Sequence, residues 1–319
     1  MEKRREFLKT AGAFAAGSII VPFGCTPKKP SESAAEKAIE PAGPKDIGIQ
    51  LYTLRNEIDA QGVDAILKKV ADAGYKWVEP YGYEDRKFLK KTPAEFKQIC
   101  TDLGMKATSV HSVTEVSSSG GKEAIIDQMK TTAEDALAIG AEYMVWAFLK
   151  PEDRTSMDDY RNHIETWNKF SEVCKEAGIQ FAYHNHDFEF QLFEGEKEMP
   201  YEMIMRETDS DLVKFEMDLF WVTMANQDPV EWIKKEPGRF HLWHVKDKVK
   251  EEDKYMVDGE ARFFAPVGKG TIDFKRIFDA RATSGMKYFF VEQDFTKEGV
   301  SPLDTMKVSW NYLNNAAFV

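Results

Sequence analysis

Side chains that suit metal binding follow short apolar runs in the C-terminal half of the chain. Asp218, His244 and Glu292 each end such a run. Carboxylate and imidazole groups together suit a divalent cation such as Mn, Co, Mg, Zn or Fe, and this mixture does not select among them. We therefore predict a divalent metal ion held by these three residues.

A pair of histidines ends another apolar run. His184 and His186 are two residues apart, so they share one side of an extended strand. The chain has six histidines. A lone histidine is more often a core residue, but two at this spacing form a frequent chelating arrangement. We predict His184 as the fourth metal ligand.

Further ionisable groups flank the predicted ligands. Glu216 lies two residues before Asp218, and Lys246 lies two residues after His244, so each shares a side of its strand with a ligand. Burying such charges is costly unless a metal or a partner charge offsets them. The alternatives are a solvated Asp218 and an ordinary salt bridge at Glu292. The predicted catalytic residues, which would position groups or transfer protons, are Glu292, His186, Glu216 and Lys246.

Other polar and aromatic residues are candidate substrate contacts. Glu79 lies in one further run and His111 ends another, and both are plausible substrate contacts or acid/base groups. Aromatic side chains, with Trp146 and Phe148 among them, would form an apolar wall for a bound substrate, and plain core packing is their alternative. The predicted substrate-binding residues are Glu79, His111, Trp221, Tyr52 and Asp247.

Eight apolar runs carry these residues, about 30 residues apart, with helical spacing between them. Eight strand–helix units in about 270 residues are the content of a (β/α)₈ TIM barrel, an α/β fold whose active site lies at the C-terminal strand ends. A doubly wound sheet is the competitor, but no Gly-rich turn follows the first run. The longest loop, 246–269, is expected to cover the mouth. The runs are 47–54, 77–81, 107–111, 143–148, 181–186, 213–218, 240–244 and 288–292.

Composition limits the partners of the chain. Its 319 residues carry a formal net charge of −11. Such a surface repels nucleic acid and anionic membranes, so we expect neither as a partner. Cys100 and Cys174 lie on apolar faces of predicted helices and are interpreted as buried thiols, with a disulfide between them as the alternative.

The N-terminus has the pattern of an export signal. Residues 3–9, KRREFLK, resemble a twin-arginine signal, and an apolar stretch at 11–21 is too short to span a bilayer. Residues 23–25 resemble a loose lipobox that ends in Cys25, the predicted lipidation site. Residues 26–45 are rich in Pro, Ser and charge and predict a flexible tether. We therefore predict a signal at 1–25, a tether at 26–45 and a single barrel domain at 46–319, in an exported, periplasmic protein with Cys25 as its lipid anchor.

From about residue 46 to the C-terminus, the chain resembles the xylose-isomerase-like barrel superfamily of sugar phosphate isomerases and epimerases. The resemblance lies in EMDLFW at 216–221, HVKD at 244–247, VE at 291–292 and a Gly-x-Gly loop at 268–270. It implies that Asp218, His244 and Glu292 are metal ligands. Two-base epimerases of this superfamily use a Glu on strand five, where this chain offers histidines. The resemblance is therefore closest to the branch of inosose dehydratases.

The resemblance implies a metal-dependent isomerase or epimerase that abstracts a proton next to the carbonyl of a sugar or keto-sugar. The alternative outcome is a carbon–oxygen lyase or dehydratase that acts on a keto-glycoside or keto-inositol by the same enolisation. A non-catalytic, exported sugar-binding protein is an alternative of another class, and the acidic charge argues against a metallo-endonuclease. The sequence leaves the substrate, the metal and the oligomeric state open.

Overall fold

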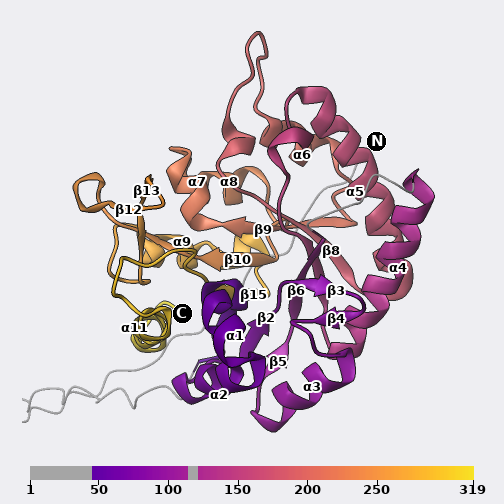
Figure 1. The fold of residues 1–319 in the computed structure, drawn as a ribbon. Coiled ribbons are helices and arrows are strands. Elements are labelled where there is room, and N and C mark those ends of the chain that lie inside the picture. Colours follow the sequence, from indigo (N-terminus) through magenta and orange to yellow (C-terminus); the bar gives the residue numbers. More distant parts are fainter. Residues whose placement is uncertain (1–44, 114–120) are drawn as a thin grey trace, which may run out of the picture. The chain divides into compact units, whose positions relative to one another are not determined.

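A computed structural model describes residues 45–113 and 121–319. It shows a ring of parallel strands with helices around its outside (Figure 1). The predicted export signal at 1–25 with Cys25, and residues 26–44 of the predicted tether, lie outside the described residues. Among the helices that are described, none combines the length and the apolar character needed to cross a membrane.

The barrel sheet contains nine strands in the order β5-β2-β1-β15-β10-β9-β8-β7-β6. All neighbours in it pair in parallel. The third predicted run is split at Thr108 into β5, which pairs with β2, and β6, which pairs with β7. The predicted (β/α)₈ barrel is thereby confirmed. The strands are β1 (Gly48–Gln50), β2 (Trp77–Glu79), β5 (Lys106–Ala107), β6 (Ser109–Val113), β7 (Tyr143–Trp146), β8 (Gln180–His184), β9 (Val213–Asp218), β10 (Leu242–Val245) and β15 (Tyr288–Val291).

The helices begin and end at the signals that the sequence contains. Thr92 and Glu95 form a reciprocal capping box at the start of α3. Helices α2 and α5 end at Gly74 and Gly178, which adopt the left-handed conformation. The helices are α1 (Arg55–Gln61), α2 (Val63–Ala73), α3 (Pro93–Asp102), α4 (Gly121–Ile139), α5 (Met157–Ala177), α6 (Pro200–Glu207), α7 (Leu219–Met224), α8 (Pro229–Lys235), α9 (Phe274–Asp279), α10 (Arg281–Ser284) and α11 (Pro302–Asn315).

The interior of the barrel changes from apolar to charged along the strands. Near the N-terminal ends, a small cluster forms an apolar floor of Tyr143, Val145, Ala182, Leu242 and Phe290. Two residues further along β8 and β10 come His184 and His244, which alternation places on the same inner side. The other side of these strands carries residues such as Trp243, which pack in the main core beneath the helices. The fold therefore supports a charged site on an apolar base.

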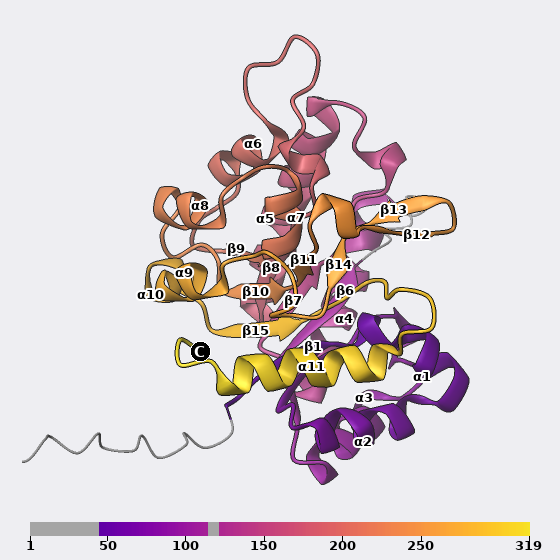
Figure 2. The same cartoon turned by 90° about the vertical axis from the view of Figure 1, so that its left-hand side faces the viewer.

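The long loop between β10 and α9 forms two hairpins. Strands β11 (Asp247–Lys248) and β14 (Phe264–Ala265) pair, as do β12 (Tyr255–Val257) and β13 (Glu260–Arg262). Figure 2 shows β12 and β13 beyond the arrowheads of β10 and β15. The Tyr255 hydroxyl donates to the Phe295 carbonyl oxygen at 2.5 Å, which ties the hairpin to the segment after β15. A third hairpin, β3 (Tyr83–Glu84) with β4 (Lys87–Phe88), follows β2.

Candidate active site

The predicted ligands from β9, β10 and β15 meet at the C-terminal ends of these strands. Ligand atoms of Asp218, His244 and Glu292 all lie within 4.8 Å of one another. A second group of candidate ligands, which includes His184, lies within the same limit and also contains His244. His184 directs Nδ1 towards Glu216 and Nε2 towards Asp218. His244 likewise directs Nε2 towards Glu79 and Nδ1 towards Glu292. We call these two the bridging histidines.

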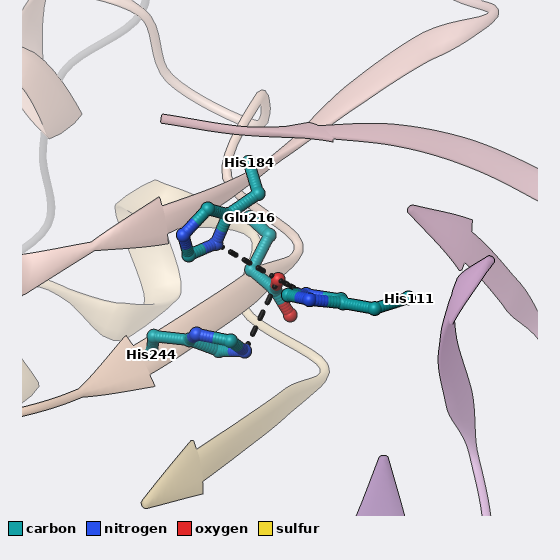
Figure 3. Close-up of side chains that lie close together, drawn as sticks. All are labelled: His111, His184, Glu216 and His244. Carbon is teal, nitrogen blue, oxygen red and sulfur yellow. Dashed lines mark hydrogen bonds and ion pairs between the residues drawn. The ribbon is translucent and has the colours of Figure 1, made fainter. Parts of the chain in front are cut away.

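The inner cluster lies below the bridging histidines and comprises Gln50, Glu79, Ser109, His111 and Glu216. One oxygen of Glu216, Oε2, lies 2.6 Å from His111 Nε2, 3.1 Å from His184 Nδ1 and 3.1 Å from His244 Nε2 (Figure 3). Burial opposes ionisation of Glu216, but the neighbouring imidazoles, His244 first, hold the pKa of its carboxyl well below the usual value. A carboxylate oxygen therefore occupies the centre of this group and accepts hydrogen bonds from the imidazoles.

Glu79 supports His244 from the other side of the inner cluster. Its Oε2 lies 2.7 Å from His244 Nε2 and accepts a hydrogen bond from Gln50 Nε2 at 2.9 Å. Its Oε1 accepts a hydrogen bond from the Ser109 hydroxyl. Burial, followed by the nearby charge of Glu216, raises the pKa of Glu79. A carboxylate that accepts a hydrogen bond from one ring nitrogen fixes the orientation of an imidazole and makes its other nitrogen a better ligand.

The outer cluster lies towards the mouth and comprises Asp218, Glu292, Lys246 and Asp294. Asp218 Oδ1 accepts hydrogen bonds from the backbone N–H groups of Phe220 and Trp221, each at 2.9 Å, and so caps α7. This cap ends the strand at Asp218, where the predicted run 213–218 also ends. Asp218 Oδ2 is buried without a hydrogen bond of good alignment. It lies 3.7 Å from His184 Nε2 and 4.0 Å from His244 Nδ1.

The outer atoms of this site fit a cation, and in this structure the Lys246 ammonium, with its Nζ 3.0 Å from Asp218 Oδ2, supplies the positive charge. Burial, as the main cause, lowers the pKa of His184 to about 4, so this imidazole is neutral. Because its Nδ1 faces Glu216, its Nε2 presents a lone pair towards Asp218 Oδ2. His244 Nδ1, also without an aligned hydrogen bond, lies 2.7 Å from Glu292 Oε2. The carboxylate oxygens of Asp218 and Glu292 that converge with these nitrogens attract a positive charge, and the donor set of two carboxylates and two imidazoles suits a divalent ion.

His186 lies just after β8 in an aromatic pocket. Its ring is parallel to that of Phe188 at 5.2 Å, and the rings of Phe148 and Trp221 lie 5.1 and 5.6 Å away. Burial lowers the pKa of His186 well below the usual value, and its Nδ1 has no hydrogen-bond partner among the described residues. A neutral imidazole beside the bridging His184, with ring centroids 4.9 Å apart, is suited to accept a proton. The predicted apolar wall of Phe148 and Trp221 is thus built around a histidine.

Three of the predicted substrate contacts, Glu79, His111 and Asp247, form hydrogen bonds to other groups of the protein. Glu79 is fully buried and His111 donates into the inner cluster, so both support the histidines from below. Asp247 accepts backbone hydrogen bonds from Lys248, Gly268, Gly270 and Ile272, which use both carboxylate oxygens. A Cβ at position 270 would lie 2.3 Å from Asp247 Oδ1, so only glycine fits there. Asp247 therefore anchors the Gly-x-Gly loop.

Tyr52 lies at the rim, where 40% of its surface is exposed. Its ring contacts Tyr81 edge-on at 5.3 Å, and the Arg55 guanidinium lies 4.2 Å from its centroid. The backbone N–H of Tyr52 donates to Gln50 Oε1, which links the rim to the inner cluster. An exposed aromatic ring at this place remains available to a ligand at the mouth.

Sequence reasoning missed several residues of the site. Gln50 and Ser109 donate to Glu79, and Asp294 pairs with Lys246 at 3.0 Å. Alternation along the last strand gives a signal for Asp294, because it lies two residues after Glu292. Gln50 and Ser109 carry no such signal, because their partners come from other strands.

The chain belongs to the xylose isomerase-like TIM barrel family, whose sequence model matches residues 67–307. The chain is 29% identical over 143 residues to inosose dehydratase of Geobacillus thermodenitrificans, which covers 41% of this chain and 46% of that protein. It is 26% identical over 177 residues to inosose dehydratase of Clostridium botulinum, with coverage of 50% and 58%. The chain thus spans about half the length of the curated relatives it matches. The predicted superfamily is confirmed, and these relatives are those of the predicted branch.

Solved structures share the whole barrel. A sugar phosphate isomerase/epimerase from Parabacteroides distasonis superposes with a TM-score of 0.74 at 27% identity and covers 91% of this chain and 99% of its own. The IOLI protein, solved with a zinc atom, superposes with a TM-score of 0.65 at 15% identity, with coverage of 86% and 99%. At this identity the second likeness supports the fold alone.

Proposed function

We propose that this protein is a divalent-metal-dependent enzyme that removes a proton next to the carbonyl of a sugar or keto-sugar. The observation that carries this proposal is the convergence of Asp218, Glu292 and the bridging histidines at the barrel mouth, with Glu216 and Glu79 behind the histidines. The names of the inosose dehydratases and of the Parabacteroides isomerase/epimerase support a carbohydrate substrate.

The proposed ligands are Asp218 Oδ2, Glu292, His244 Nδ1 and His184 Nε2. A divalent cation held there would supply Lewis acidity, which stabilises negative charge on a carbonyl oxygen. With a metal bound, the inner cluster would hold the hydrogen of each bridging histidine on its inner nitrogen, and the outer nitrogens would donate electron pairs to the metal. The proposed metal site would thus combine four ligands with the groups that orient them.

The other residues of the mouth have roles that follow from their positions. His186 takes the proton from carbon, because its unpartnered Nδ1 lies in a pocket beside His184. The aromatic rings of Phe188 and Trp221 exclude water from this imidazole. Lys246 holds a proton that it can give to a departing or reforming oxygen. Tyr52 offers its exposed ring to the apolar face of a sugar.

Elimination is the favoured outcome for this site. The described strand β8 carries no carboxylate, so a second base opposite the first, as in two-base epimerases, is missing from it. With His186 as the one base, the carbon–hydrogen bond breaks, its electron pair forms a double bond, and the bond to the β-oxygen breaks. That oxygen leaves as water or an alcohol after it takes a proton. Reprotonation of the same carbon from the opposite face would instead give an epimer, and protonation of the former carbonyl carbon would give an isomer.

Exchange in deuterated water separates these outcomes. The full-length protein, loaded with Mn²⁺, is incubated with 2-keto-myo-inositol and with 3-keto-glucosides, and the products are followed by NMR. We expect an unsaturated product and released water or alcohol, and none with Asp218→Asn. Deuterium at the α-carbon of an intact skeleton would indicate an isomerase. Binding of these sugars without exchange or product would contradict the proposal and favour a sugar-binding protein.

We further propose that the protein is exported and lipid-anchored at Cys25, on the sequence pattern of residues 1–25. An exported enzyme meets non-phosphorylated sugars, in agreement with the keto-sugar proposal. Labelling of cells with an alkyne fatty acid tests the anchor. We expect label on the wild-type protein and none on Cys25→Ala, whereas unlabelled wild-type protein in the cytoplasmic fraction would contradict both parts.

A further inference from the structure

The ammonium group of Lys246 lies among three carboxylates. Its Nζ is 3.0 Å from Asp218 Oδ2, 2.8 Å from Glu292 Oε2 and 3.0 Å from Asp294 Oδ1. The side chain of Lys246 is 2% exposed and that of Asp294 is 13% exposed. Two of these carboxylates are proposed metal ligands, and the third is not.

A buried ammonium needs a partner charge. Leaving it unpaired in the protein interior would be strongly unfavourable, because it would lose both water and counter-charge. A divalent cation at Asp218 and Glu292 takes the lone pairs that now face Lys246, and it repels the ammonium at short range. Asp294 is then the carboxylate that can still pair with Lys246, through either of its oxygens, at 3.0 and 3.3 Å.

We propose that Lys246 and the divalent cation compete for the carboxylates of Asp218 and Glu292, and that Asp294 is the positioning residue that holds Lys246 when the cation takes them. This inference rests on the proposed metal site. It gives Lys246 two pairings, one with the ligand carboxylates and one with Asp294 nearer the rim. The second pairing places the ammonium beside the substrate, so metal loading and the supply of a proton donor are coupled.

The Trp221 ring lies beside the Lys246 ammonium. The Lys246 Nζ lies 5.8 Å from the centroid of the Trp221 ring, which also lines the pocket of His186. An ammonium near the face of an indole is attracted by it.

A double-mutant cycle tests the competition. Mn²⁺ and Zn²⁺ binding to the full-length protein is measured, each ion separately, by isothermal titration calorimetry without substrate. The variants are Lys246→Met, Asp294→Asn and the double variant. We expect Lys246→Met to bind metal about tenfold more tightly, since the competing charge is gone, and Asp294→Asn to bind about tenfold more weakly. In the Lys246→Met background, Asp294→Asn should have little further effect.

The cycle separates a specific pairing from general electrostatics. If Asp294 acted only through its negative charge, Asp294→Asn would weaken binding by the same factor with and without Lys246, which would overturn the inference. Weaker metal binding by Lys246→Met would also overturn it. Lys246→Gln, which keeps a hydrogen-bond donor, repeats the test if the methionine variant does not fold, and thermal melts in EDTA check each variant.

Failure of this inference is distinct from failure of the proposed function. A wild-type protein that binds metal, with binding lost in Asp218→Asn but no coupling between positions 246 and 294, overturns only the role of Asp294. A wild-type protein that binds neither ion overturns the metal site and this inference together.

Discussion

The two ends of strand β10 carry histidines with opposite electrostatic surroundings. His241 directly precedes the strand and lies near the apolar floor, with its Nδ1 3.1 Å from the Tyr143 hydroxyl. Burial, followed by the charges of Lys214 and Lys287, lowers the pKa of His241 to about 4. His244 lies three residues on and is completely buried, yet its neighbours, first Glu216 and then Glu292, outweigh burial and raise its pKa well above the usual value.

The comparison shows that the described part of the barrel interior buries charged groups at the C-terminal ends of its strands and not at the N-terminal ends. At the N-terminal ends, the fold keeps imidazole and phenol groups neutral beside apolar side chains. At the C-terminal ends, it concentrates carboxylates, imidazoles and an ammonium in one place. Packing explains the first region. The proposed metal site accounts for the second, because a hydrophobic interior of the same volume is often as stable or more stable.

Loss of a proposed ligand should give the largest effect. Asp218→Asn keeps the cap of α7, since asparagine caps helices as well as aspartate does, but removes the charge of Oδ2. We expect kcat to fall by about 10³-fold or more, with metal binding lost and the melting temperature nearly unchanged. His241→Asn, at the other end of the barrel, is the matched control and should keep both kcat and metal binding. Equal losses in the two variants would contradict the division into two regions.

Removal of an orienting carboxylate should have the next largest effect. Glu79→Gln keeps the shape of the side chain but weakens its hydrogen bond to His244 Nε2. We expect metal affinity to fall by about 10- to 100-fold, because the bridging histidine loses its preferred orientation. Calorimetric titration with Zn²⁺ measures the change. Unchanged affinity would show that the inner cluster serves packing alone.

A substitution in the floor should affect stability without affecting the site. A Cβ at Gly48, in β1, would lie 2.5 Å from Phe290 Cδ1 and 2.7 Å from the Phe289 carbonyl oxygen. We expect Gly48→Ala to lower the free energy of unfolding by about 1–3 kcal/mol through overpacking. Urea denaturation gives this value, and kcat per folded molecule should stay at the wild-type level. A selective loss of kcat would contradict the separation of floor and mouth.

The smallest expected effect is a change in the pH dependence of stability. The pKa of His241 is lowered to about 4 from 6.5. As the pH falls, the unfolded chain therefore takes up this proton first, and the contribution of His241 to stability, complete above pH 6.5, is lost through pH 4. We expect His241→Asn, which still accepts from Tyr143, to show a shallower decline in this range. Parallel denaturation curves for the two proteins would refute the assignment.

Much of the fold follows from patterns that are local in sequence. The apolar runs, their spacing and the caps at Thr92 and Gly178 mark strands and helices before any contact is known. Helix α7 was not predicted, because its mostly apolar residues, Leu219 to Met224, directly follow strand β9 and resemble more of the same apolar run. The residue that marks the start of this helix is Asp218, and from sequence alone an aspartate there is equally compatible with a metal ligand and with a helix N-cap.

The site was predictable in part for the same reason. Strand ends show that Asp218, His244 and Glu292 converge, because parallel strands in a barrel end at one face. The pairing of Glu79 with His244, 165 residues apart, depends on which strands lie opposite each other after closure. The role of Asp247 was equally hidden, since its partners belong to a loop more than twenty residues later. Such contacts are properties of the closed barrel.

The location of a bound metal tests the central claim most directly. Crystals of the full-length protein grown with Mn²⁺ give an anomalous difference map at the manganese edge. The account predicts one strong peak about 2.0–2.3 Å from Asp218, Glu292, His244 Nδ1 and His184 Nε2. A peak instead among His111, Glu216 and His244 Nε2, or no peak in the barrel, would contradict it.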